Sequence, residues 1–297
     1  MRHSYASLIW RQFKKSRLAV AALILVISLF VIAIFAPLIA SDKSISIGGF
    51  KISAPIPFSP NSYDLSRILE GPSFTHPLGT DGQGRDVLSQ LVWGSRVSIS
   101  VGFVAVGISV IIGILLGVLA GYYGGAVDIV ISRLIEVMMC FPTFFLILAV
   151  LAFIGPSIYN IMIVIGLTSW TGVARLVRGE CLKLRSREFV VAARVAGARD
   201  RRIVFRHLLP NALSPVLVSA TFGVASAILV EASLSFLGFG VPPSTASWGS
   251  LLSQAQDFMD VAWWLTLAPG FAIFLTVTAY NLVGEGLRDA IDPNLKT

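Results

Sequence analysis

Six apolar runs, each close to the length that crosses a lipid bilayer, dominate this sequence. A membrane-spanning helix takes about 20 apolar residues. The chain is 55% hydrophobic and only 13% charged, which is too little charge to cover the surface of a soluble protein of this length. The sequence therefore predicts an all-α polytopic membrane protein with about six transmembrane helices. We place these helices near residues 18–39, 97–122, 134–154, 158–174, 212–232 and 263–283.

Positive charge is concentrated in two segments that flank these runs. Residues 1–17 carry five basic and no acidic side chains, and residues 175–208 carry ten basic and three acidic side chains. Segments rich in Lys and Arg remain on the cytoplasmic side of a membrane. We therefore interpret the basic charge as an orientation signal and expect a lipid membrane, not nucleic acid, around this chain. An even number of spans then places both termini in the cytoplasm, with the chain in the cytoplasmic (inner) membrane.

This topology divides the chain into four parts. Residues 1–40 are a cytoplasmic tail and a leader transmembrane helix, and residues 41–96 are an extracytoplasmic loop. Residues 97–284 form a core of five transmembrane helices, and residues 285–297 form a cytoplasmic tail. In the outer loop only residues 45–52 alternate like a β-strand, so we expect either a small ordered cap or a loop without regular structure.

Small residues recur every fourth position in the second apolar run, at Gly113, Gly117, Gly121 and Gly125. This spacing lays them on one face of a helix and lets a second helix approach closely. Two interpretations stay open at this point. The glycines form a packing groove within the chain, or they form an interface with a second subunit.

Two carboxylates and one proline interrupt the apolar runs. A carboxylate inside a membrane often marks a transport pathway or a proton relay. Glu136 and Glu231 both lie near predicted boundaries, however, and we favour structural roles in which Glu136 pairs with Arg133 and Glu231 faces outer water. Pro142 is expected to kink the third span, because proline removes a helix hydrogen bond.

Motifs of enzymatic chemistry are missing from the sequence. It contains no Gly-x-x-x-x-Gly-Lys-Ser/Thr phosphate loop, no His-Glu-x-x-His and no Gly-x-Ser-x-Gly. The three histidines, His3, His76 and His207, fall in separate segments. We therefore expect a non-catalytic chain that holds no metal and no cofactor of its own.

The basic segment 175–208 is too regular to be a simple tether. Ala192 and Ala193 favour a helix and permit close approach of a partner. Gly197 permits a tight turn, and Pro210 is expected to end a second short helix before the fifth span. A helix–glycine–helix element on the cytoplasmic face is typical of a docking site for a cytosolic protein.

This segment resembles the EAA loop of binding-protein-dependent ABC importers. Ala192-Ala193, Gly197 and Leu209-Pro210 match the loop's spacing, whereas Val191 stands where the family has Glu and His207 where it has Ile. Further stretches resemble the dipeptide/oligopeptide/nickel permease group, and the leader span is typical of its C-type subunit. These stretches are residues 76–87, 124–133, 234–249 and 287–293.

The resemblance implies a permease subunit of an ATP-driven importer that moves dipeptides or oligopeptides, with nickel or another small solute as the alternative. It implies four kinds of partner or surrounding: a homologous B-type permease, ABC ATPase subunits that hold ATP and Mg, an extracytoplasmic solute-binding protein, and the lipid membrane. It also implies coupling to the ATPase through residues 175–210. The coupling residues are Ala192, Ala193, Gly197, His207, Leu209 and Pro210.

Other roles remain open for several charged residues. Asp81, Arg85 and Asp86 are candidates for contact with the binding protein, or equally for stabilising the outer loop. The arginines of the basic segment can pair with acidic groups on a partner or with lipid headgroups, or they simply hold the segment inside. These arginines are Arg194, Arg199, Arg201, Arg202 and Arg206.

Two rival functions are weighed against the importer. An ion-coupled secondary transporter would need ionisable residues deep in the spans, and Glu136 is the one plausible candidate. A membrane scaffold would need no ATPase partner. Neither explains the Ala-Ala, Gly and Leu-Pro spacing of the basic segment.

Overall fold

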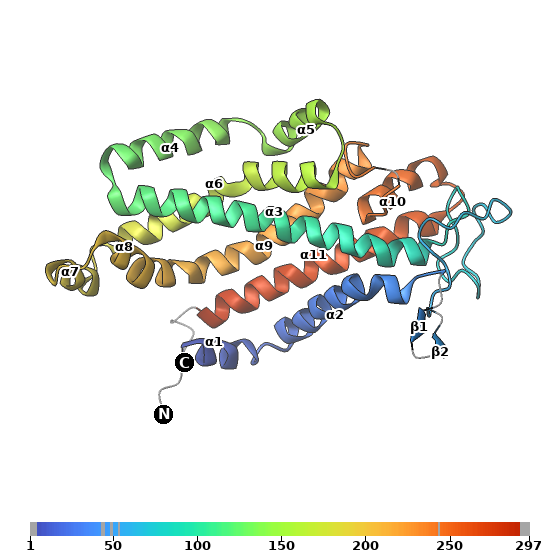
Figure 1. The fold of residues 1–297 in the computed structure, drawn as a ribbon, viewed down its shortest axis with the longest axis horizontal. Helices are drawn as coiled ribbons and strands as arrows, with labels where there is room; N and C mark the ends of the chain where they lie inside the picture. Colours follow the sequence, from blue (N-terminus) through green and yellow to red (C-terminus); the bar gives the residue numbers. More distant parts are fainter. Residues whose placement is uncertain (1–4, 43–44, 48–49, 53, 243, 292–297) are drawn as a thin grey trace.

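The chain forms a long bundle of helices with a small hairpin and an irregular loop at one end (Figure 1). This computed structural model describes residues 5–42, 45–47, 50–52, 54–242 and 244–291. His3, the family-like pair Asp292-Pro293 and the end of the predicted tail 285–297 lie outside the described residues.

Five helices of the described residues are long and apolar enough to cross a membrane, and a bent pair supplies a sixth span. The pair consists of α4 (Gly125–Cys140) and α5 (Thr143–Ile154), which meet at an angle of 82°. The break contains Pro142, so the kink predicted there is confirmed. The five long helices are α2 (Arg17–Ile39), α3 (Val87–Tyr123), α6 (Ile158–Leu184), α9 (Leu209–Phe236) and α11 (Trp263–Ile291).

Several helices extend beyond the apolar runs that predicted them. Helix α3 begins at Val87, not at residue 97, because the Asp86 carboxylate caps its first turn through the Ser89 N–H at 2.7 Å. Helix α6 continues to Leu184, through the start of the basic segment, and α4 begins at Gly125, ahead of the third predicted span at residue 134. The predicted spans ended where polar side chains begin. The helices continue through these residues, because backbone hydrogen bonding in a helix does not require apolar side chains.

The glycine stripe of α3 packs against α6 within the chain. A Cβ atom added at Gly113, Gly117 or Gly121 would come within 2.6 Å of an α6 atom. Gly125 does not belong to this groove, because a Cβ atom there would have nothing within 4 Å. Gly125 instead has φ +54° at the first residue of α4, where it serves the turn.

The described ends of the chain lie at the same end of the bundle. Helix α1 (Tyr5–Phe13) packs against the last turns of α11, and both lie toward the end that carries α7 and α8 (Figure 1). The antiparallel hairpin of β1 (Ile45–Ile47) and β2 (Phe50–Ile52) lies at the opposite end. An even number of crossings accounts for this arrangement.

The two intramembrane carboxylates have different surroundings. Glu136 forms an exposed ion pair with Arg133, as predicted. Glu231 is completely buried, so the prediction that it faces outer water is wrong. Its carboxylate accepts hydrogen bonds from the Ser235 hydroxyl at 2.8 Å and the Ser98 hydroxyl at 3.1 Å. The short helix α10 (Trp248–Ala255) packs over the outer ends of α3, α9 and α11 and closes this site.

Candidate functional site

The basic segment folds into an elbow between α6 and α9. We call residues 185–208 the inner elbow, after the side predicted by their charge. Helix α7 (Glu188–Val195) leads to Gly197, and α8 (Asp200–Ile203) follows. Gly197 has φ +78°, in the left-handed region that favours glycine, and its N–H donates to the Arg194 carbonyl at 3.0 Å. The Ala198 N–H donates to the Ala193 carbonyl at 3.0 Å, which completes a Schellman turn.

Pro210 does not end the second arm of the elbow, contrary to the sequence-based prediction. A π-helical turn, η1 (Val204–Leu208), joins α8 directly to α9. The Leu209 N–H donates to the Val204 carbonyl, five residues back. Proline donates no hydrogen bond and its ring crowds the carbonyl four residues before it, and the wider π turn accommodates both effects. The second arm is therefore continuous with the fifth span.

The inner face of the elbow is anchored in an apolar cluster. Val190 of α7, Ile203 of α8 and Leu208 of η1 are completely buried. They pack with side chains from the ends of three long helices. These partners are Val118 and Tyr122 of α3, Val173, Val177 and Cys181 of α6, and Val216 of α9. Because each arm has its own buried anchor, the elbow is fixed to the bundle along its length.

Tyr122 at the end of α3 adds a polar anchor. Its hydroxyl donates to the Asp200 carboxylate of α8 at 2.6 Å. The Arg194 guanidinium of α7 lies 5.9 Å from the centre of the Tyr122 ring. One side chain thus contacts both arms of the elbow. The sequence alone does not indicate this contact, because 78 residues separate Tyr122 from Asp200.

The opposite face of the elbow is exposed and mixes apolar with basic side chains. Phe189 of α7 is 44% exposed, Val195 is 83% exposed, and Phe205 of η1 is 61% exposed. Phe205 and the exposed side chains Arg199, Arg201 and Arg202 line a hollow of about 400 Å³. No described carboxylate lies within ion-pair distance of these three arginines. This face has the composition of a protein-binding surface, in which aromatic and Arg side chains are enriched.

The six residues predicted to couple this chain to an ATPase fall into two groups. Ala192 and Gly197 are exposed at the tip of the elbow, beside the half-buried Ala193. The other three lie near its root. The His207 ring is 6.3 Å from that of Phe189, Leu209 packs against the inner apolar cluster, and Pro210 is exposed.

At the opposite end of the bundle the loop of residues 54–86, which we call the outer cap, is ordered by buried charges. The Asp81 carboxylate accepts hydrogen bonds from Arg85 Nε at 2.7 Å and from Gln90 Nε2 at 2.8 Å. It also accepts the backbone N–H groups of Gln83 and Arg85. Arg85 Nη2 reaches the Gln254 side chain near the end of α10 at 2.6 Å. Of the two alternatives for this loop, the ordered cap is the one observed.

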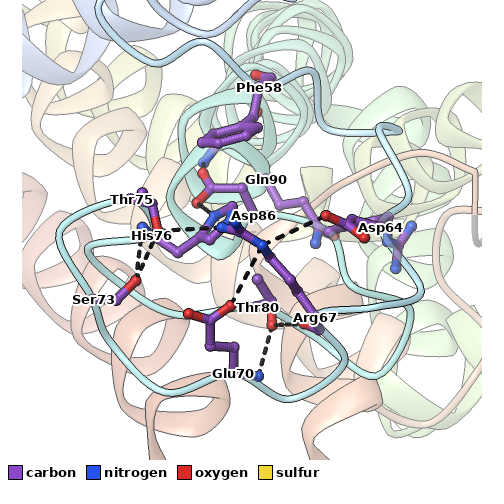
Figure 2. A network of polar contacts seen from close by, with 12 residues as sticks. Phe58, Asp64, Arg67, Glu70, Ser73, Thr75, His76, Thr80, Asp86 and Gln90 are labelled. Atoms are coloured by element: carbon purple, nitrogen blue, oxygen red, sulfur yellow. Dashed lines mark hydrogen bonds and ion pairs between the residues drawn. The ribbon is translucent and has the colours of Figure 1, made fainter.

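His76 and Asp86 form a second buried pair in the outer cap. Their side chains meet at 2.9 Å, and the His76 ring lies 4.5 Å from that of Phe58 (Figure 2). Asp81, Arg85 and Asp86 are exposed by only 1%, 4% and 2% of their surface. These three side chains therefore stabilise the loop and present no surface to a binding protein, which corrects one of the two predicted roles.

The outer cap is also fixed to the transmembrane helices. The Trp264 indole N–H of α11 donates to the Thr80 carbonyl at 3.1 Å, and the Ser89 hydroxyl of α3 donates to the Phe58 carbonyl at 2.8 Å. At the exposed edge, hydrogen bonds from the Ser66 hydroxyl and then from its backbone N–H lower the pKa of Asp64. The ionised Asp64 pairs with Arg67 at 3.7 Å.

Comparison with known families gives two matches along the chain. Residues 113–297 match the family described as the binding-protein-dependent transport system inner membrane component. Residues 4–72 match the N-terminal transmembrane domain of oligopeptide transport permease C. Together these matches include the leader helix, the inner elbow and most of the outer cap.

Similar proteins align over nearly the whole chain. The dipeptide transport system permease protein DppC of Alkalihalophilus pseudofirmus is 42% identical over 288 residues, which cover 97% of this chain and 90% of that protein. The glutathione transport system permease protein GsiD of Escherichia coli is 41% identical over 287 residues, with the same coverage of 97% and 90%. A chain of the inward-facing MetNI methionine ABC transporter has a similar fold, with a TM-score of 0.56, 19% identity and coverage of 69% and 98%.

Proposed function

Because the chain belongs to the family of binding-protein-dependent transport system inner membrane components, we propose that it moves dipeptides or short oligopeptides across the cytoplasmic membrane. It acts as the C-type permease subunit of an ABC importer, beside a homologous B-type permease. ATPase subunits bind the inner elbow and hydrolyse ATP, and a solute-binding protein delivers the peptide to the outer side.

The observation that carries the substrate class is the 42% identity to a dipeptide permease over 97% of the chain. A glutathione permease is nearly as similar, at 41% identity, and glutathione is itself a small peptide. The shared chemistry of these substrates is an amide backbone with a terminal carboxylate.

The inner elbow supports the coupling role through its two different faces. Val190, Ile203 and Leu208 are buried against the bundle, whereas Phe189 and Phe205 are exposed on the other side. A force applied to the exposed face passes to the ends of α3, α6 and α9, because packed protein interiors deform little. Motion of an ATPase thus becomes motion of the spans.

Reconstitution of the importer tests this proposal. The chain is purified with its B-type partner and ATPase subunits, placed in lipid vesicles, and supplied with ATP inside and peptide-loaded binding protein outside. We expect ATP-dependent accumulation of a radiolabelled dipeptide. Accumulation of nickel in place of any peptide, or dipeptide uptake that is unaffected by omission of ATP, would contradict it.

Gly197→Ala tests the coupling role in the same vesicles. Alanine at φ +78° is disfavoured by about 1 kcal/mol, so the substitution strains the turn between α7 and α8. We expect peptide uptake to fall about tenfold. The matched control is Gly179→Ala in α6, where a Cβ atom would have nothing within 4 Å and the helix accepts alanine readily. Equal uptake by the two variants would show that the elbow does not couple.

A further inference from the structure

A pocket lined by both polar and apolar side chains lies at the outer end of the bundle, apart from the inner elbow and beside the outer cap. It has a volume of about 550 Å³, which is within the usual range for sites that bind small molecules. Its walls come from the outer cap, the first turns of α3, the start of α6 and the loop before α10. Its polar lining includes Ser59, Asn61, Arg96, Ser100 and Thr245.

Arg96 is the charged residue of this pocket. No described carboxylate lies within ion-pair distance of its guanidinium group. The other two described arginines on this side are paired, Arg67 with Asp64 and Glu70, and Arg85 with Asp81. Among the described arginines on this side, Arg96 is therefore the one that forms no ion pair with a described carboxylate. It lines a space that is large enough for a ligand.

The position of Arg96 is set by its neighbour Trp93. The Trp93 indole N–H donates to the Ala40 carbonyl at 2.8 Å, which fixes the ring between α3 and the end of α2. The Arg96 guanidinium lies 5.3 Å from the centre of this ring. Stacking on an aromatic face orders the guanidinium plane and leaves its edge N–H groups for a planar acceptor. A carboxylate fits that geometry because it accepts two parallel hydrogen bonds.

The rest of the pocket suits a peptide. Ser59, Asn61 and Thr245 offer hydroxyl and amide groups that both donate and accept hydrogen bonds, as the peptide backbone requires. The Ser100 hydroxyl donates to the Val97 carbonyl at 2.9 Å and can accept a further hydrogen bond. None of the described residues that line the pocket is acidic, so none of them repels a carboxylate. The charge and the size of the site therefore match one end of a short peptide.

We propose that this outer pocket receives the C-terminal carboxylate of the transported peptide on Arg96 as the peptide leaves its binding protein. This inference rests on the proposed function and names a recognition step within it. Arg96 binds the carboxylate, and the neighbouring hydroxyl and amide groups orient the adjacent peptide unit.

Uptake by the complete importer in vesicles tests this site. Arg96→Gln is compared with the wild type for a dipeptide and for its C-terminal amide, each at concentrations that saturate the wild-type binding protein. We expect Arg96→Gln to lower uptake of the free acid about tenfold, because a charge-assisted bidentate contact is lost. Uptake of the amide should remain unchanged, and Arg96→Lys should restore part of the uptake of the free acid.

Arg67→Gln is the control, because it removes an outer arginine that is already paired and should leave both rates within about twofold. An equal loss for acid and amide would overturn the proposal in favour of a structural or lipid contact. A rise in the concentration of binding protein needed for half-maximal ATPase activity would instead identify a docking contact. Wild-type uptake with no effect of Arg96→Gln would refute this inference alone, whereas a wild type that accumulates neither peptide would refute the proposed function.

Discussion

The inner elbow and the outer cap both carry many charges, but they use them in opposite ways. In the outer cap, Asp81 and Arg85 are buried and bind each other at 2.7 Å. In the elbow, Arg199, Arg201 and Arg202 are exposed around a hollow, next to the exposed ring of Phe205. The cap satisfies its charges within the chain, whereas the elbow leaves them available.

This difference separates a region built for stability from a region built for contact. A buried ion pair with further hydrogen bonds fixes one geometry, and loss of one partner leaves an uncompensated buried charge. Exposed arginines contribute little to folding, so we expect their role to lie in what they bind or in holding the segment on the inner side. The elbow combines stability with contact, because its inner face packs against the bundle and its outer face is exposed.

The largest expected effect is on stability in the outer cap. Arg85→Met removes the partner of Asp81, whose carboxylate is 1% exposed. We expect a loss of about 3–5 kcal/mol in the free energy of unfolding, measured as a lower melting temperature in detergent micelles. The outer loop should also become sensitive to protease.

Arg67→Met is the matched control for this change. Arg67 pairs with Asp64 at 3.7 Å and with Glu70 at 3.9 Å, and its side chain is 43% exposed. The same substitution should therefore cost less than about 1 kcal/mol. Similar melting temperatures for the two variants would mean that burial does not distinguish these pairs.

A smaller effect is expected where the elbow meets the bundle. Tyr122→Phe removes the hydroxyl that donates to Asp200 at 2.6 Å but keeps the ring beneath Arg194. A hydrogen bond to a charged group contributes about 1.5–3 kcal/mol. We expect a modest fall in melting temperature together with a lower ratio of peptide transported to ATP hydrolysed.

The neighbouring Tyr123→Phe serves as the control, because Tyr123 is 56% exposed. It should change neither the melting temperature nor the transport ratio. If Tyr122→Phe lowered stability but kept the full transport ratio, the elbow would not need its polar anchor to transmit force.

The sequence predicted about six spans in the right order because each apolar run is close to the length that crosses a bilayer. It misplaced their ends wherever polar residues continue a helix. Residues 87–96 of α3 include Ser89 and Gln90, whose partners lie in the outer cap. Those partners are 31 and 9 residues away, and a hydropathy pattern does not identify them.

Features of the sites could be predicted from the sequence where the backbone preference of a single residue determines them. The turn at Gly197 follows from the residue's own conformational freedom, and the bend at Pro142 from its missing N–H. The burial of Glu231 depends on Ser98, which is 133 residues away. The continuity of the helix past Pro210 depends on a π turn that propensity alone does not indicate.

The smallest expected effect on stability is at the exposed face of the elbow. Arg201→Gln removes one guanidinium from the hollow that Phe205 also lines. A surface substitution of this kind changes the free energy of unfolding by less than about 0.5 kcal/mol. Capture of the ATPase subunit should nevertheless weaken about threefold and become less dependent on salt, because a charge at the contact is lost.

Arg133→Gln on α4 removes another exposed guanidinium, the one that pairs with Glu136, and should leave ATPase capture unchanged. Affinity measured with immobilised ATPase at two salt concentrations separates the two variants. Equal losses would mean that the net positive charge of the chain attracts the ATPase. A loss confined to Arg201→Gln would locate the ATPase contact on the exposed face of the elbow. That face contributes little to the free energy of unfolding, and its role would then be in coupling.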